Sequence, residues 1–139
     1  MSLERFPIRI GRRSRPVLFF FGVKADGSNA WVELTDDAVA ARFGWSSFRT
    51  PVTNVARWRI EGPWLWITAI GFRRSNRHRD ITYGGSPHGG VRLDFHEPPR
   101  LGVFRPPAVY LTVDDLDAFA AALAGRGIPG EDGRKRIVP

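Results

Sequence analysis

Apolar and polar residues alternate along much of the chain with the two-residue period of a half-buried β-strand. In ARWRIEG (56–62) every second residue from Ala56 to Ile60 is apolar, and the charged residues between them would face solvent. VRLDFH (91–96) repeats this pattern, and AWVELTDDAVAARFG (30–44) contains two such segments around an Asp-Asp pair. The pattern predicts a hairpin over residues 30–44 and single strands over the other two segments.

Two continuous apolar runs are too short for a typical helix and predict buried strands. They are PVLFFFGV (16–23) and WLWITAIGF (64–72), and both are far shorter than the ~20 residues of a membrane-spanning helix. The polar segment RSNRHR (74–79) then predicts a turn, DITYG (80–84) a returning strand, and VYLTV (109–113) a further strand.

The hydrophobic period changes in DDLDAFAAALAG (114–125), which predicts a helix. Apolar residues recur there at i, i+3, i+4 and i+7 and form one helical stripe: Leu116, Phe119, Ala120 and Leu123. Asp114 is the predicted N-cap, because its carboxylate can accept a hydrogen bond from a free backbone N–H group. Gly125 is predicted to end the helix in the left-handed conformation.

The order of elements is therefore about eight short strands followed by one amphipathic helix, without an internal repeat. That order predicts an α+β, mostly β fold in which a sheet is closed by the helix. A length of 139 residues suits a single domain, which we divide into a basic N-terminal arm (1–15), a core (16–124) and a basic tail (125–139).

Composition limits the classes of function. The chain has no cysteine, which excludes disulfides, thiolate metal sites and cysteine nucleophiles. Its net charge of +7 suits nucleic acid or an anionic membrane as a partner, although a GC-rich genome would produce the same arginine-rich composition. The N-terminus lacks the apolar core of a signal peptide, so we expect a cytoplasmic protein, with peripheral attachment to a membrane as an open alternative.

Two stretches carry a resemblance to a known family. WVELTDDAVAARFG (31–44) with FRTPVTNVARWRI (48–60), and GVRLDF (90–95) with VYLTVDDLDAFAAAL (109–123), resemble bacterial pleckstrin-homology-like (PH-like) domains, including small actinobacterial proteins of this type. The resemblance implies a bent β-barrel or sheet of about seven or eight antiparallel strands closed by the C-terminal helix. It implies a binding module and carries no activity or cofactor with it. The loop KADGSN (24–29) departs from phosphoinositide-binding PH domains, which place several basic residues there.

A second resemblance concerns VYLTVDDLDAFAAALAGRGIP (109–129), which is similar to the strand-helix opening of glyoxalase-like (vicinal-oxygen-chelate) modules. That resemblance implies a small-ligand or metal-binding protein, with metal ligands on three strands after the helix. Only 14 residues follow Gly125, too few for those strands. We keep this function as the alternative.

The densest basic segment lies around the turn predicted between residues 72 and 80. It contains Arg73, Arg74, Arg77, His78 and Arg79. Guanidinium groups pair with phosphate and carboxylate, so the segment is a candidate anion-binding site, and the alternative is a solvated hairpin tip. The tail holds a second candidate group, Arg134, Lys135 and Arg136.

No catalytic or metal-binding motif is found in the sequence. The histidines His78, His88 and His96 lack the spacing of a metal-ligand pair, so we predict neither a metal nor another cofactor. The motifs G-x-S-x-G and GK[ST] are also absent, which disfavours serine hydrolases and P-loop enzymes.

Aromatic residues leave one more interpretation open. Four tryptophans could stack on bases of single-stranded nucleic acid beside nearby arginines, or they could fill the core: Trp45, Trp58, Trp64 and Trp66. We therefore predict a non-catalytic binding module that contacts a protein partner or an anionic membrane or phosphate surface. Nucleic-acid binding and homo-oligomerisation remain alternatives.

Overall fold

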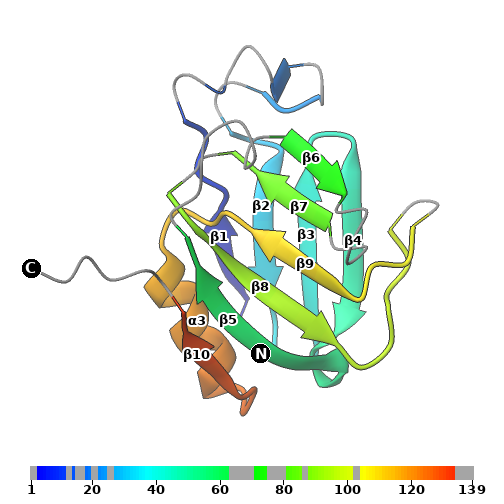
Figure 1. Cartoon of the computed structure of the whole chain (residues 1–139), viewed down its shortest axis with the longest axis vertical. Coiled ribbons are helices and arrows are strands. Elements are labelled where there is room, and N and C mark those ends of the chain that lie inside the picture. Colours follow the sequence, from blue (N-terminus) through cyan, green and yellow to red (C-terminus); the bar gives the residue numbers. More distant parts are fainter. Residues whose placement is uncertain are drawn as a thin grey trace, which may run out of the picture.

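The chain forms two stacked β-sheets and a helix, α3 (Leu116–Gly125) (Figure 1). The computed structural model describes residues 3–11, 14, 18–19, 22–24, 27–62, 71–74 (backbone), 81–85, 88–101 and 104–133. In Figure 1 a six-stranded sheet lies in front of a four-stranded sheet. No helix in this described part of the chain is long and apolar enough to cross a lipid bilayer.

The four-stranded sheet is an antiparallel meander. Its strands pair in sequence order: β1 (Glu4–Pro7), β2 (Ala30–Leu34), β3 (Ala38–Phe43) and β4 (Ser46–Pro51). β2 and β3 confirm the predicted hairpin, with the turn at the two aspartates. Thr35 closes this turn, because its hydroxyl accepts a hydrogen bond from the Ala38 N–H (3.0 Å) and its own N–H donates to the Ala38 carbonyl (2.9 Å).

The hydrophobic pattern predicts neither β1 nor β4. β1 lies within the segment that we assigned to a basic arm, yet Phe6 and Ile8 are 9% and 3% exposed. β4 directs only Phe48 and Thr50 into the interior. Because serines and charged residues flank these short alternations, pairing with the neighbouring strands is what identifies both elements.

The six-stranded sheet combines segments from the rest of the chain. In spatial order its strands are β10 (Gly130–Asp132), β5 (Val55–Glu61), β8 (Gly90–Phe95), β9 (Ala108–Leu111), β7 (Ile81–Gly84) and β6 (Gly71–Arg74). The alternating segments of β5 and β8 are confirmed as strands. β6 and β7 are an antiparallel pair on either side of the predicted turn.

Not all strands are antiparallel, which corrects the prediction. β9 enters the sheet between β8 and β7, and it is antiparallel to β8 but parallel to β7. β10 is parallel to β5. The local alternation of a strand does not encode its direction relative to a neighbour, so the sequence pattern could not supply this information.

The two sheets do not close into a barrel, which corrects the expectation of a bent barrel. The number of described strands is also larger than the seven or eight that we expected. Between described residues, the chain after β1 reaches the second sheet at an isolated bridge between Ile8 and Val113. The Arg9 N–H donates to the Thr112 carbonyl (3.0 Å), and the Asp114 N–H donates to the Pro7 carbonyl (2.8 Å). The observed architecture is thus α+β and mostly β, with two stacked sheets joined along part of one edge.

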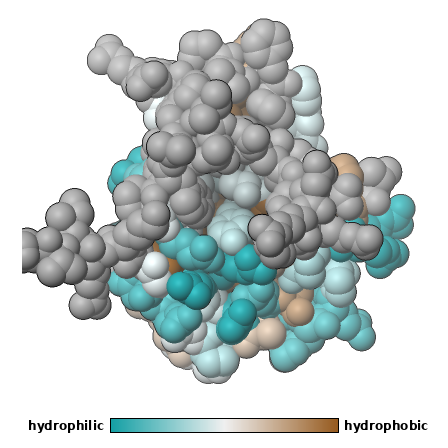
Figure 2. Space-filling view, viewed as in Figure 1, coloured by the Kyte–Doolittle hydropathy of each residue, from teal (hydrophilic) through white to brown (hydrophobic). Residues whose placement is uncertain are grey.

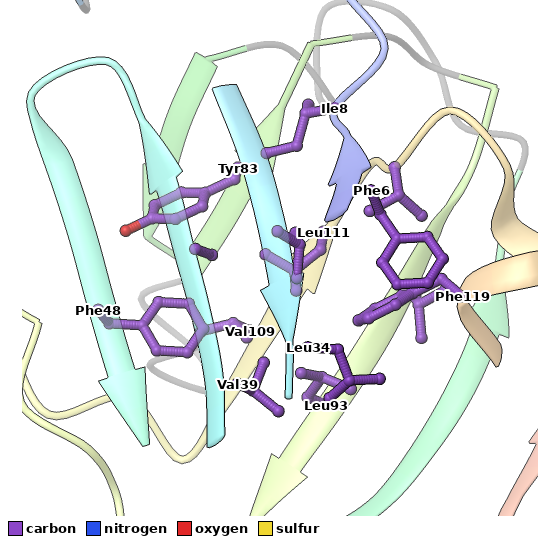
Figure 3. Packing of buried hydrophobic residues seen from close by; sticks show 14 of the residues in the cluster. Phe6, Ile8, Leu34, Val39, Phe48, Tyr83, Leu93, Val109, Leu111 and Phe119 are labelled. Carbon is purple, nitrogen blue, oxygen red and sulfur yellow. The ribbon is translucent and has the colours of Figure 1, made fainter. Parts of the chain in front are cut away.

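A hydrophobic core fills the space between the sheets (Figure 3). Phe6 of β1 meets Phe119 of α3 with their ring centroids 5.0 Å apart, and Phe43 stacks on Tyr83 across the sheets at 5.4 Å. Full burial of one such side chain contributes roughly 1.5–3 kcal/mol. These contacts fix the relative position of the two sheets and the helix.

The predicted stripe of α3 is confirmed, because Leu116, Phe119, Ala120 and Leu123 are its buried residues. The capping residues at its two ends differ from the prediction, by one position at the N-terminus and by two at the C-terminus. Asp115 is the N-cap and accepts a hydrogen bond from the Ala118 N–H (3.0 Å), whereas Asp114 forms an ion pair with Arg9. Gly127, with φ +80°, takes the left-handed conformation in place of Gly125.

The apolar run over residues 16–23 is not a strand where it is described. Leu18 and Phe19 are helical, the Gly22 N–H donates to the Phe19 carbonyl, and the Val23 N–H donates to the Leu18 carbonyl (both 3.1 Å). With φ +78° at Gly22, this pair of bonds is the usual end of a helical turn. Leu18 and Val23 are nevertheless buried, whereas Phe19 is 75% exposed. The predicted strand was therefore wrong, and burial is confirmed for Leu18 and Val23 but not for Phe19.

Candidate anion-binding groove

A surface groove of about 580 Å³ lies where the end of β4 meets the segment that follows β8. We call it the basic groove and define it by Arg49, Asn54, His96, Glu97, Arg100 and Arg105. The first two come from β4 and the 3-10 helix η2 (Val52–Asn54), and the others from the chain between β8 and β9. Figure 1 shows the ends of β4 and β8 and the start of β9 gathered at one corner of the molecule.

Asn54 holds the two walls of the groove together. Its Nδ2 donates to the Thr50 hydroxyl (2.9 Å) and to the Glu97 carbonyl (2.8 Å), and its Oδ1 accepts from the Glu97 N–H (2.9 Å). Its backbone carbonyl accepts a fourth bond from the His96 N–H (2.9 Å). One side chain thus uses both ends of its amide to fix η2 against the segment after β8.

The sequence explains why the chain turns at this place. Pro51 ends β4 in an extended conformation (φ −61°, ψ 146°), and Val52 then enters the core while its N–H donates to the Asp37 carbonyl (2.9 Å). Arg49 precedes this turn on the exposed face of β4, because the buried positions of the strand are Phe48 and Thr50. The turn therefore brings Arg49 and Asn54 to the same groove.

The groove carries more positive than negative charge. Among its described lining residues are three arginines and a single acidic residue, Glu97. Among the described residues, Arg49 and Arg105 form no hydrogen bond or ion pair with their side chains.

Arginines elsewhere in the described chain are mostly paired with carboxylates. Asp94 pairs with two arginines, through Arg57 Nε to Oδ2 (2.9 Å) and Arg92 Nε to Oδ1 (3.0 Å). Arg59 Nη1 lies 3.4 Å from Glu131 Oε1. Arg5 pairs with Glu33, Arg9 with Asp114, and Arg126 with Glu4. Within the described part of the chain, Arg49 and Arg105 of the basic groove therefore keep guanidinium groups available for an external anion.

The groove offers donors of the kind that bind phosphate or carboxylate. A guanidinium presents up to five N–H groups in a rigid fork that fits two oxygens of such an anion, and the exposed His96 and Thr53 add an imidazole and a hydroxyl. Within the described ranges, no group of three histidine, aspartate or glutamate side chains could hold a metal ion. The donors of the groove suit an anion such as phosphate or carboxylate.

A second hollow, of about 500 Å³, lies at the start of α3 beside His88, and its lining is acidic, with Arg9 against Asp114, Asp115 and Asp117. Arg9 Nε lies 2.6 Å from Asp114 Oδ1, and Arg9 Nη2 donates to the Asp114 carbonyl (3.1 Å). His88 Nε2 is 2.8 Å from the Val113 carbonyl oxygen. These contacts join the chain after β1 and the loop before β8 to the helix start, which is a structural role.

The structure describes only part of the sequence-predicted basic cluster. Arg73 and Arg74 belong to β6, where their backbones pair with Thr82 and Ile81 of β7. The remaining predicted residues lie outside the described residues: Arg77, His78, Arg79, Arg134, Lys135 and Arg136. Arg73 and Arg74 thus lie on the edge strand of the six-stranded sheet, and the ability of the cluster to bind an anion stays a prediction.

The tryptophans that the structure describes are not gathered on one surface. Trp45 is 78% exposed at the turn between β3 and β4, whereas Trp58 is half-buried on β5 and donates to the Ile128 carbonyl (3.0 Å). Trp64 and Trp66 lie outside the described residues. The turn with Trp45 connects strands of the four-stranded sheet, whereas Trp58 lies in the six-stranded sheet, and a stacking platform of all four tryptophans stays a prediction.

The sequence contained little that could have identified the basic groove. Its arginines are spread over residues 49–105 and follow no motif. Only the proline-rich stretch around Arg100 and Arg105 indicated a surface loop, and the contact of that loop with η2 depends on Asn54. Comparison of the chain with protein-family models, with curated proteins and with solved structures found no match.

Proposed function

We propose that the protein is a non-catalytic binding module that holds a phosphate or carboxylate group of its partner in the basic groove. The observation that carries this proposal is the pair of unpartnered guanidinium groups, Arg49 and Arg105, in a hollow whose walls Asn54 fixes. Repulsion among nearby arginines is relieved when an anion binds, and a preformed site requires little reorganisation. The partner is an anionic membrane surface or an acidic or phosphorylated protein in the cytoplasm.

We also propose that the fold is a variant of the PH-like architecture. The antiparallel meander of β1–β4 and the position of α3 after the last long strands support this relationship. The parallel β7–β9 pair and the open sandwich are additions that the resemblance does not imply. The proposed binding function does not depend on this relationship, because it rests on the residues of the groove.

Co-sedimentation with phosphatidylcholine vesicles, with and without phosphatidylserine, tests the proposal at low and at physiological salt. The test variant is Arg49→Ala/Arg105→Ala. Each basic residue near an anionic surface contributes about 1 kcal/mol, so this variant should bind about 30-fold more weakly. Calorimetric titration with inorganic pyrophosphate distinguishes recognition of a free phosphate group from recognition of a membrane surface.

A matched control removes the same charge from another place. Arg57→Ala/Arg59→Ala also removes two exposed arginines, but both are paired with carboxylates on the outer face of the six-stranded sheet. It should retain most of the binding. Equal losses in the two variants would show that net charge alone drives binding, and binding of neither vesicles nor pyrophosphate by the wild type would contradict the proposal.

The predicted cluster needs its own variant in the same assay. Arg73, Arg74, Arg77 and Arg79 are replaced together by alanine. Loss of binding in this variant alone would move the site to the β6–β7 hairpin, whereas retained binding would identify the cluster as a solvated turn.

A further inference from the structure

The last described strand, β10, covers one edge of the six-stranded sheet with very little structure of its own. Its three residues are all exposed, and it lies beside β5, after the end of α3 (Figure 1). The Trp58 N–H donates to the Pro129 carbonyl (3.0 Å), and the Gly133 N–H donates to the Ile60 carbonyl (2.8 Å). These backbone bonds satisfy an edge of β5 that would otherwise present free donors and acceptors.

Two glycines of this segment lie close to side chains of β5, and the rigid indole of Trp58 makes Gly130 the one that tolerates no side chain, whereas the flexible end of Arg59 could move. A Cβ atom at Gly130 would overlap the indole ring of Trp58, and one at Gly133 would overlap the guanidinium of Arg59. The Trp58 indole N–H also donates to the Ile128 carbonyl (3.0 Å). The β5 edge therefore accepts an extended chain only where a residue without a side chain crosses Trp58.

Charge specifies the next position. Glu131 is in register with Arg59, and its carboxylate lies 3.4 Å from that guanidinium. The side chains of Trp58 and Arg59 thus match a glycine followed by an acidic residue.

The segment is held by contacts that are easily exchanged. Its ion pair is exposed at both ends, with 47% and 66% of the two side chains accessible, and β10 buries no apolar side chain. Exposed ion pairs add little stability, and short edge strands open readily. Sheet edges are also a common place for another chain to add a strand, because backbone hydrogen bonds supply affinity and side-chain pockets supply specificity.

We infer that the β5 edge is a docking site for an extended partner peptide that carries a glycine followed by an acidic residue. The chain's own segment Pro129–Gly133 occupies this edge in cis, and the partner takes its place with the same parallel register. Binding here is independent of the basic groove, because the two places share no residue. The partner cannot bind while Pro129–Gly133 covers the β5 edge. Its apparent affinity is therefore reduced to the fraction of molecules in which the edge is open.

The test uses the full chain and a fluorescent peptide with the protein's own sequence 127–133, GIPGEDG. In Gly130→Val the added side chain meets Trp58 and should release the segment. The peptide should then bind about 10-fold more tightly to this variant than to the wild type, since a tethered competitor acts at a millimolar effective concentration. The Trp58 indole N–H resonance should shift in Gly130→Val relative to the wild type and should return towards its wild-type position when peptide is added. This return would show that the peptide binds at the β5 edge.

Gly125→Val is the matched control, because a Cβ at Gly125 has no atom within 4 Å. It should bind the peptide like the wild type. A peptide with valine in place of its second glycine, and one with lysine in place of its glutamate, should both bind Gly130→Val more weakly. Failure of the peptide to bind a Gly130→Val chain whose Trp58 resonance has shifted would overturn the inference, as would equal binding of all three peptides.

Discussion

At the scale of single residues, two histidines on either side of β8 show how their surroundings decide what an imidazole does. His96 is exposed at the basic groove, whereas His88 is half-buried against the Val113 carbonyl. Burial disfavours the charged imidazolium and lowers the pKa of His88 from its ordinary value of 6.5, and Arg9 adds to this effect. The Val113 carbonyl and Asp114 oppose the shift without reversing it.

His88 should therefore make the folded protein less stable in acid. Its pKa is lower in the folded than in the unfolded state, so folding is most favoured above pH 6.5 and loses stability as the pH falls below that value. His88→Gln keeps a donor for the Val113 carbonyl but does not titrate. The loss of unfolding free energy between about pH 7.5 and about pH 5 should be smaller in His88→Gln than in the wild type.

Urea unfolding at the two pH values measures this difference. Both proteins keep the carboxylates beside His88, which are Asp114, Asp115 and Asp117, so the comparison reports the effect of replacing the imidazole. Identical pH profiles would show that His88 does not contribute to acid sensitivity.

At the scale of elements, the two described α-helical segments end in the same way. In each, a glycine with positive φ donates one hydrogen bond to the preceding turn, and the residue after it donates a second across five residues: Gly22 with Val23, and Gly127 with Ile128. This geometry satisfies the last carbonyls of the helix and turns the chain back towards the core. Val23 and Ile128 are accordingly buried.

A pair of alanine substitutions tests which glycine ends α3. Gly127→Ala places a Cβ in the left-handed conformation and should reduce the free energy of unfolding by roughly 1–2 kcal/mol. Gly125→Ala places the same atom in an open helical position and should stabilise by roughly 0.5 kcal/mol. Denaturant unfolding of the two variants gives the comparison, and a larger loss in Gly125→Ala would restore the end predicted from the sequence.

The elements that the sequence predicts well are those whose burial repeats with a fixed period, such as β5, β8 and α3. Their boundaries depend on distant partners. Asp114 has the chemistry of an N-cap but binds Arg9, which is 105 residues away, and this leaves the cap to Asp115. In the run at 16–23, Leu18 and Val23 are buried as expected, but Phe19 is exposed and Gly22 ends a helical turn there. Local spacing identifies which residues are buried and does not contain the tertiary contact that sets their conformation.

The basic groove could not be predicted from the sequence for the same reason. Arg49 and Arg105 are 56 positions apart, and their approach depends on the pairing of β4, on the turn at Pro51 and on the two-sided amide of Asn54. A dense cluster such as Arg73–Arg79 is visible in a sequence because its members are adjacent. A site assembled from single residues on separate elements becomes visible only when those elements are placed.

At the scale of the whole molecule, β1 and the residue that follows it connect the two sheets and the helix α3. Its Phe6 packs on Phe119 of α3, its backbone extends the first sheet beside β2, and Ile8 just beyond it bridges to Val113 of the second sheet region. The N-terminal segment therefore belongs to the core that defines the fold. An arm that served only to carry basic residues would be dispensable for stability, so the two roles can be separated by one substitution.

Phe6→Ala should destabilise the protein by about 3–5 kcal/mol, because a buried aromatic ring is lost at the contact between β1 and α3. Sheets and helix share this core, so circular dichroism and tryptophan fluorescence should still report one coincident unfolding transition at a lower denaturant concentration. Leu3→Ala is the control, since Leu3 is 62% exposed and its loss should change stability by less than about 0.5 kcal/mol. If Phe6→Ala were as stable as Leu3→Ala, the N-terminal segment would be an arm after all. If its two probes separated, the sheets would unfold as independent units rather than around one core.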